Sequence, residues 1–409
     1  MTSEWRTIRA ADFIDFNPRL SLKKGDIATK VAMDKLKPFT KKIPETEKAE
    51  FNGGAKFCNG DTVMARITPC LENGKTAYVD MLDDGEIGFG STEFIVMRAK
   101  TGISDPQFVY YTAINPVFRN VAIKSMVGSS GRQRVQQSVL EELELSVPDL
   151  EEQRRIGAFL ARIDEKIALN DRINDNLRQQ AQALFKKWFA DNPDAILWKE
   201  GTFSNLIEKT ISGDWGKDSP SGNNTEMVYC IRGADIPEVR AGNKGKMPTR
   251  YILPKNYAAK QLVDGDIVVE ISGGSPTQST GRAAAVSDAL LARYDKGMVC
   301  TNFCKALKPR AGYSMYVYYY WQYLYDRDIF FSYENGTTGI KNLDINGFIE
   351  TEPIVIAPED LVEKFDAVCQ TVFSKIYANG MENEQLALVR DTILPKLMSG
   401  EIDVSAVQL

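Results

Sequence analysis

The residues that follow Pro148 carry the most regular hydrophobic pattern of the chain. From about 151 to 190 there is no proline and one glycine, and apolar residues recur at alternating steps of four and three. This period predicts one long helix, on the order of 60 Å, with a coiled-coil seam. The predicted seam comprises Ile156, Leu160, Ile163, Ile167, Asn170, Asn174, Leu177 and Leu184.

A second stretch of the same kind begins near Glu359, although its start is less sharply marked. Its centre, around Asn379-Gly380, is polar or locally broken, and Pro395 is expected to end the helix early. The predicted seam comprises Leu361, Phe365, Val368, Val372, Leu386, Val389 and Ile393.

Both seams are apolar at their ends and polar in the centre, where Asn170 and Asn174 lie. Two such helices pair best antiparallel, with their centres aligned. A buried asparagine pair would fix the register at some cost in stability, so replacing both residues with Ile should disturb register or assembly. The alternative is that each helix packs only on its own domain.

The chain also repeats itself, because six segments recur in the same order between 193 and 210 residues later. The offset grows in one direction, which fits one duplicated unit of roughly 200 residues. The matched pairs are Trp5 with Trp198, 59–63 with 264–268, 73–77 with 280–284, 110–111 with 318–319, 128–131 with 336–339, and 147–149 with 357–359.

Each copy begins with a strand-and-turn region, with alternating apolar residues at 62–67 and 267–271, and ends in a long helix with an acidic start. We therefore predict an α+β protein with two domains of mixed β-sheet and helices, related by pseudo-two-fold symmetry and joined by two long helices that form an antiparallel coiled coil. The predicted segments are the first domain at 1–148, its helix at 149–192, the second domain at 193–357, and the distal helix and tail at 358–409.

Composition excludes several classes of chemistry. The 409 residues allow two to three domains and contain no histidine, which removes histidine-based nucleophile pairs and histidine-ligated metals. The six cysteines lack zinc-knuckle spacing and are expected to be reduced thiols of a cytosolic protein, so no metal is expected. No signal peptide or membrane span is expected either.

The net charge of −5 means that any nucleic-acid surface must be local. Residues 23–42 hold seven lysines against two aspartates, and residues 119–134 hold four basic residues and no acid. Residues 141–152 hold six acids and no base, which suits a protein partner. The basic segments suit phosphate contacts, although a lysine cluster is also compatible with an ordinary solvated surface.

Four loops combine flexible residues with amides, hydroxyls and bases, and they occur as two matched pairs: 66–75 with 272–282, and 129–134 with 335–342. Gln and Asn pair with adenine edges, Arg pairs with guanine, and hydroxyls hold phosphates. Trp215 lies in a polar, Gly-rich loop and is predicted to be an exposed aromatic residue that contacts DNA. The tyrosine-rich block 316–323 is predicted to belong to the hydrophobic core rather than to form a stacking platform. The candidate DNA-binding residues are Lys23, Lys24, Lys35, Lys37, Lys41, Lys42, Arg66, Thr68, Asn73, Lys75, Ser129, Ser130, Arg132, Gln133, Arg134, Trp215, Lys217, Ser272, Ser275, Thr277, Gln278, Thr280, Arg282, Asn335, Thr337, Thr338, Lys341 and Asn342.

With this domain order, the chain resembles the DNA-specificity subunit of type I restriction–modification systems. The resemblance covers essentially the whole chain and is most specific at Pro148–Glu165 and Leu394–Ile402. It implies two target-recognition domains, each reading one half of a split site on double-stranded DNA, and a coiled coil that sets the spacing and docks two methyltransferase subunits. It also implies that the chain binds no cofactor, that S-adenosylmethionine, ATP and Mg belong to the modification and restriction subunits, and that the complex is cytoplasmic and acts on the nucleoid.

Two other classes of function remain open. Asn115-Pro116-Val117-Phe118 resembles the catalytic motif of adenine methyltransferases, but it lacks the second proline and lies at a predicted helix start. Gly216-Lys217 and Gly245-Lys246 both fail the phosphate-loop pattern, which argues against an ATPase. A coiled-coil adaptor without DNA recognition would show no salt-dependent duplex binding in its assembled complex.

Overall fold

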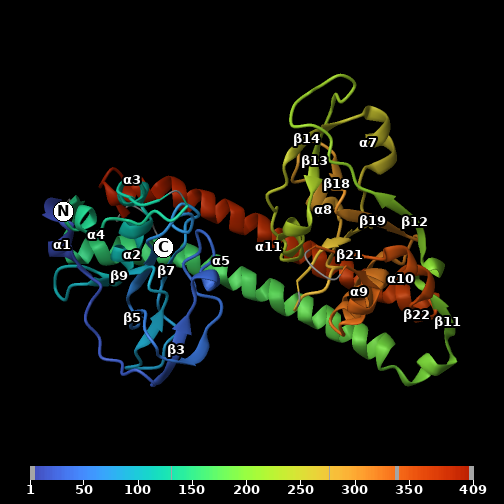
Figure 1. Cartoon of the computed structure of the whole chain (residues 1–409), viewed down its shortest axis with the longest axis horizontal. Coiled ribbons are helices and arrows are strands. Elements are labelled where there is room, and N and C mark those ends of the chain that lie inside the picture. Colours follow the sequence, from blue (N-terminus) through green and yellow to red (C-terminus); the bar gives the residue numbers. More distant parts are fainter. Residues whose placement is uncertain (1–4, 130, 276, 337–339, 405–409) are drawn as a thin grey trace. The chain divides into compact units, whose positions relative to one another are not determined.

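The computed structural model describes residues 5–129, 131–275, 277–336 and 340–404 (Figure 1). The chain divides into two compact units. Unit 1 comprises Met1–Ala168 and Gln385–Leu409, and unit 2 comprises Leu169–Glu384. Each unit therefore contains part of both long helices. Among the described residues, no helix combines the length and apolar character needed to cross a bilayer.

Unit 1 contains two four-stranded sheets and a two-stranded pair. The first sheet has the order β2 (Ile14–Phe16), β9 (Phe94–Ala99), β6 (Thr62–Ala65) and β7 (Thr76–Tyr78), all antiparallel. The second has the order β4 (Glu47–Glu50), β3 (Ile27–Val31), β8 (Gly88–Gly90) and β5 (Ala55–Phe57), with β3 and β8 parallel. The pair is β1 (Arg6–Arg9) with β10 (Glu144–Val147). The short helices are α1 (Ala10–Phe13), η1 (Met33–Lys35), α2 (Pro106–Ile114), α3 (Pro116–Lys124) and α4 (Gln137–Glu141).

Unit 2 repeats this plan. Its four-stranded sheet has the order β12 (Ile207–Ser212), β19 (Cys304–Pro309), β15 (Ile267–Glu270) and β17 (Ala283–Ala285). The other sheets are β14 (Thr249–Ile252), β13 (Glu226–Ile231) and β18 (Met298–Cys300); β16 (Ser272–Gly273), β21 (Lys341–Leu343) and β20 (Glu334–Asn335); and β11 (Lys199–Thr202) with β22 (Pro353–Ile356). The short helices are η3 (Pro193–Leu197), η4 (Phe203–Asn205), η5 (Gly233–Asp235), α6 (Ile236–Arg240), α7 (Pro254–Lys260), α8 (Asp288–Leu291), α9 (Ser314–Tyr325), η6 (Ile329–Tyr333) and α10 (Ile345–Thr351).

The matched strand orders support the duplication predicted from sequence. β6 and β15 lie where the alternating segments predicted strands, and each is paired on both sides in an equivalent sheet. The parallel pair β3–β8 corresponds to β13–β18. In the described part of unit 2, no strand corresponds to β5.

In unit 1, α2 follows β9 and packs against its sheet. In unit 2, α9 follows β19 and packs against the equivalent sheet. α2 is capped by Asp105, whose carboxylate accepts the backbone N–H groups of Gln107 and Phe108. α9 contains the aromatic block, and Tyr316, Tyr318, Tyr319 and Trp321 are all buried there. The prediction that this block is core rather than a stacking platform is therefore confirmed.

The two long helices are α5 (Leu150–Phe185), which continues into the π-helical turn η2 (Lys186–Ala190), and α11 (Glu359–Met398). α11 is unbroken at Gly380 and runs through Pro395, so the expected early end is wrong. Pro395 lies in the last turn, where it removes a single backbone hydrogen bond. Gly380 allows the backbone at Gly242 to approach α11 closely, because a Cβ at position 380 would come within 1.9 Å of the Gly242 carbonyl oxygen.

The predicted seam of α11 needs a correction at two positions. Val368 and Val389 are exposed, whereas Cys369 and Arg390 are buried. A strict seven-residue count drifts relative to a helix of 3.6 residues per turn, so the inward face moves by one residue. In α5 the predicted seam is buried at Ile156 and Leu160 and half-buried at the remaining apolar positions of the prediction, namely Ile163, Ile167, Leu177 and Leu184.

Inside unit 2, buried amides join α5 to α11 in an antiparallel arrangement. The Asn170 Nδ2 group donates to Asn383 Oδ1 at 2.9 Å, and Asn379 Nδ2 donates to Asn174 Oδ1 at 2.8 Å. Asn174 Nδ2 also donates to the carbonyls of Ile376 and Ala241, both at 3.1 Å. All four asparagines are buried. Each amide therefore meets its partner only when the two helices are in this register.

Inside unit 1, charged groups take the place of these amides. Arg390 on α11 donates to Asp164 on α5 at 2.5 Å, and both side chains are buried. Asp164 also accepts the Tyr111 hydroxyl at 2.6 Å, which ties α2 to the helices. The start of α5, with Ile156 and Leu160, and the end of α11 both pack into the hydrophobic core of unit 1. The helices thus pair with each other, as predicted, and the alternative that each packs only on its own domain is wrong, although both helices also contact the domain elements beside them.

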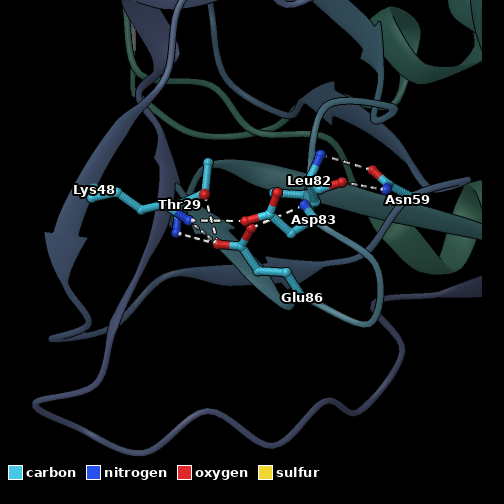
Figure 2. Close-up of polar contacts among 6 residues, drawn as sticks. All are labelled: Thr29, Lys48, Asn59, Leu82, Asp83 and Glu86. Carbon is cyan, nitrogen blue, oxygen red and sulfur yellow. Dashed lines mark hydrogen bonds and ion pairs between the residues drawn. The ribbon is translucent and has the colours of Figure 1, made fainter.

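A polar cluster around Glu86 holds the second sheet of unit 1 together (Figure 2). The Glu86 carboxylate accepts Lys48 Nζ at 2.7 Å, Thr29 Oγ1 at 2.6 Å, and the backbone N–H groups of Thr29 and Asp83. These hydrogen bonds, led by the one from Lys48, lower the pKa of Glu86 to about 2. The turn 82–86 is thereby fixed to β3 and β4.

Glu86→Gln should destabilise β3 by about 2 kcal/mol near pH 7, because the charged acceptor is lost. The lowered pKa stabilises unit 1 fully above the ordinary glutamate pKa and progressively less as pH falls toward about 2. Hydrogen exchange of β3 amides at several pH values measures both effects. Glu50→Gln, an exposed change on β4, is the control. A difference from wild type that persists unchanged at pH 2 would contradict this account.

Asn174→Ile should cost about 2–3 kcal/mol, because Asn379 and two carbonyls lose their buried partner. Asn174→Ile combined with Asn379→Ile should recover part of this loss, since an apolar pair leaves fewer groups unpaired. Chemical denaturation in a double-mutant cycle measures the coupling, with Asn176→Ala on the exposed face of α5 as the control. Strictly additive losses would show that the two amides do not act together.

Candidate nucleic-acid interface

In unit 1, the structure brings the two predicted loops together. The Thr68 backbone N–H donates to the Gln133 carbonyl at 3.0 Å, and the Val135 N–H donates to the Arg66 carbonyl at 2.8 Å. An isolated β-bridge joins Ile67 to Arg134. Segment 66–75 therefore lies against the described residues 127–129 and 131–135, and we call these segments loop pair 1.

Unit 2 places its counterparts together in the same way. β16, from the loop 272–282, pairs with β21, which also pairs with β20. The Leu343 N–H donates to the Ile271 carbonyl at 2.9 Å. We call the described residues of these segments, 272–275 and 277–282 with 334–336 and 340–343, loop pair 2. The internal repeat therefore includes this contact, because the equivalent loops are hydrogen-bonded to each other in both units.

A buried carboxylate joins the two segments of loop pair 2. Glu334 accepts the Thr280 N–H at 2.6 Å, the Thr280 hydroxyl at 3.0 Å and Lys341 Nζ at 2.7 Å. Its side chain is only 4% exposed. Beside loop pair 1, the Glu93 carboxylate similarly accepts hydrogen bonds from Arg134 through both of its oxygens. These carboxylates hold the loops in shape before any ligand binds.

Several predicted basic residues are consequently committed to internal partners. Arg282 is held by Glu270 in a bidentate pair, and Lys75 donates to the Met33 carbonyl at 2.8 Å. Arg134, Lys341, Lys35 and Lys42 form ion pairs with Glu93, Glu334, Glu45 and Asp80 respectively. Each of these cations already has a partner within the protein, which is a backbone carbonyl for Lys75 and a carboxylate for the others, and their contact with DNA stays a prediction.

Two of the predicted contact residues are buried, which argues against a direct contact with DNA. Lys41 is 5% exposed and lies among the rings of Tyr78, Tyr110 and Tyr111, where burial lowers its pKa to about 8. Thr280 is 0% exposed and its hydroxyl is used by Glu334. The composition of a basic or Gly-rich segment does not predict whether a given polar side chain points into the core or into solvent.

Other predicted residues are accessible. The exposed set is Lys23, Lys24, Lys37, Asn73, Ser129, Arg132, Lys217, Thr277, Gln278, Asn335 and Asn342. Gln133, Thr68, Ser272 and Ser275 are half-buried. Ser130, Thr337 and Thr338 lie outside the described residues. Both loop pairs therefore present amides and hydroxyls, and loop pair 1 adds the guanidinium of Arg132.

Trp215 is less free than its sequence suggests. It is 38% exposed, and the Arg250 guanidinium lies 4.1 Å from the centre of its ring. Arg250 also donates to the Trp215 carbonyl at 2.8 Å. One face of the indole is thus already occupied by an arginine.

Sequence reasoning missed a basic cleft beside loop pair 1. Arg19, Lys56 and Arg66 line a cavity of about 580 Å³ that contains no carboxylate among its lining residues. The buried Arg66 Nε has no hydrogen-bond partner within the described structure. Arg19 and Lys56 lie outside the two basic segments, so no local charge cluster could have revealed them.

The described ranges contain no cluster of metal-ligating side chains, and the Asn115 side chain is used within its own helix. No group of three or more acidic or cysteine side chains in the described ranges is placed to hold a metal ion. The Asn115 side chain accepts the Val117 N–H at 3.1 Å and caps α3. Asn115 is thus a helix cap, as its position before Pro116 predicted.

Glu334→Gln should loosen loop pair 2 while leaving loop pair 1 unchanged, because Lys341 and Thr280 lose their charged partner. We expect faster hydrogen exchange by about tenfold or more at Thr280 and in β21. Hydrogen exchange resolved by residue measures this, with Glu200→Gln on the exposed edge of β11 as the control. Equal acceleration in loop pair 1 would contradict a local role.

Comparisons with known proteins agree with this arrangement. Residues 3–179 match the type I restriction modification DNA specificity domain family. The chain is 26% identical to the type I restriction enzyme MjaIX specificity subunit of Methanocaldococcus jannaschii, over 69% of this chain and 66% of that protein. It is 24% identical to the HindI specificity subunit of Haemophilus influenzae, over 84% and 86% respectively.

The fold is also shared with a solved structure. The crystal structure of the type I restriction-modification system S subunit from M. genitalium aligns with a TM-score of 0.51 at 17% identity, covering 97% of this chain and 96% of that one. The duplicated fold, the paired loops and the sequence matches lead to one assignment. Residues 3–179 match the type I restriction modification DNA specificity domain family, and the chain is similar to type I restriction enzyme specificity subunits over most of its length.

Proposed function

We propose that this chain is the DNA-recognition subunit of a type I restriction–modification complex, and that each loop pair reads one half of a bipartite site. The observation that carries this proposal is the recurrence of one loop pair, built from equivalent segments, in both copies of a duplicated fold. A duplicated reader suits two half-sites on one duplex.

The exposed side chains give each loop pair its chemistry. Asn73 and Gln278 suit adenine edges, and Arg132 suits guanine or phosphate. Carboxylates such as Glu93 and Glu334 keep neighbouring cations in place, so the loops meet DNA already ordered. Such preorganisation lowers the entropy cost of binding.

The helix pair supports the remaining parts of the proposal. α5 and α11 act as a spacer whose register sets the gap between half-sites, and with the acidic segment 141–152 they offer surfaces for two methyltransferase subunits. Restriction subunits join that assembly, in the cytoplasm. S-adenosylmethionine, ATP and Mg belong to those partners, and this chain performs no chemistry itself.

Selection of binding sites from a random duplex pool tests the proposal, using the full chain assembled with its methyltransferase subunits. Wild type should select two short motifs separated by a fixed gap. Arg132→Glu should relax one motif, by about tenfold or more at the affected base pairs, and Gln278→Glu should relax only the other. Lys199→Gln, an exposed change on β11, is the control.

The outcomes separate the candidate functions. Relaxation of both motifs by either variant would contradict the assignment of one half-site to each unit. An adaptor would select no motif and would show no salt-dependent binding. Methylation of DNA by the chain alone with S-adenosylmethionine would favour the methyltransferase alternative.

A further inference from the structure

Phe39 is an exposed aromatic residue in an unusual backbone conformation. Its side chain is 54% exposed, and its φ of 54° lies in the left-handed region. It follows Pro38 in a turn, at a position where positive φ normally selects Gly or Asn. A phenylalanine there costs roughly 1–2 kcal/mol relative to glycine. Nothing in the turn itself requires an aromatic ring.

The surrounding structure fixes this ring on loop pair 1. The Phe39 N–H donates to the Gly74 carbonyl at 2.9 Å. A Cβ at Gly74 would lie 2.6 Å from the ring, so the glycine leaves room for close packing. Loop 66–75 and the turn at Phe39 are therefore one rigid surface.

Arg119 completes this arrangement. Its guanidinium lies 5.2 Å from the centre of the Phe39 ring and donates to the carbonyls of Leu71 and Glu72. The ring is thus held between a glycine and an arginine that is itself fixed, while more than half of its surface remains open to solvent. Lys37, two residues away, is exposed and supplies a positive charge at the same turn.

We propose that Phe39 packs against the bases of the half-site read by unit 1, through a thymine methyl group or an opened base step. This inference rests on the proposed function and adds a residue that the basic and Gly-rich patterns did not indicate. Duplex DNA is the occupant we favour, because the ring shares a rigid surface with Asn73 and a positively charged turn with Lys37.

Phe39→Gly tests the proposal in the full chain assembled with its methyltransferase subunits. Glycine relieves the left-handed strain, which offsets the lost packing against Gly74 and Arg119, so the Tm should change little. Affinity for the selected duplex should fall by about tenfold or more, with relaxed preference only in the motif affected by Arg132→Glu. Phe39→Tyr should retain most of the affinity. Ile27→Ala, at an exposed apolar position on β3, is the matched control.

Each outcome is decisive for the inference. Unchanged affinity for Phe39→Gly would overturn it, and the proposed function would still stand if Arg132→Glu relaxes a motif. Loss of assembly with the methyltransferase subunits would also overturn it, since the ring would then belong to a protein interface. If Phe39→Gly lowers the Tm, Phe39→Asn, which tolerates the left-handed conformation, gives the same comparison. Absence of duplex binding by wild type would remove the proposed function as well.

Discussion

The antiparallel register of α5 and α11 is the constraint on which the rest of the structure depends, and buried polar groups fix it. A purely apolar seam tolerates sliding, whereas an amide or charge away from water must meet its partner. In unit 2 that requirement falls on Asn170 with Asn383 and Asn174 with Asn379, and in unit 1 on Asp164 with Arg390. Through Tyr111 and the Ala241 carbonyl, the same groups also bind the neighbouring domain elements. Helix register and domain position are therefore set by one network within each unit.

The loop pairs apply the same physical principle at the surface. Carboxylates with little exposure, Glu334 above all, use basic and hydroxyl groups to tie separate segments together. Charged residues of a loop thus divide into those that build the surface and those that remain available to a ligand. Because the whole arrangement occurs twice, each copy can diverge in its exposed side chains while the supporting strands and carboxylates remain. Such a division suits a protein whose two halves read different sequences on the same scaffold.

Several features could be predicted from sequence, because each depends on a period or a repeat along the chain. They are the duplication, the long helices, the strands β6 and β15, and the burial of the tyrosine block. The surroundings of the other side chains could not be predicted, because they depend on neighbours in three dimensions. Val368 and Val389 turned outward as the helical period drifted from seven residues, and Lys41 was drawn among three tyrosine rings. Arg282, the residue before β17, pairs with Glu270 at the end of β15. Phe39 carried no sequence signal, because its role depends on the glycine and arginine beside it.

Single-molecule sequencing of methylated bases, in cells with and without this gene, tests the central claim most directly. The account predicts loss of one methyladenine motif made of two short specific halves separated by a fixed, unspecified gap, while other methylation stays unchanged. Restoring the wild-type gene should restore that motif. If a motif is lost but is continuous rather than split, the assignment of one half-site to each unit is contradicted. If no motif is lost in cells whose methyltransferase subunits are present and active, the chain does not direct methylation and the account fails.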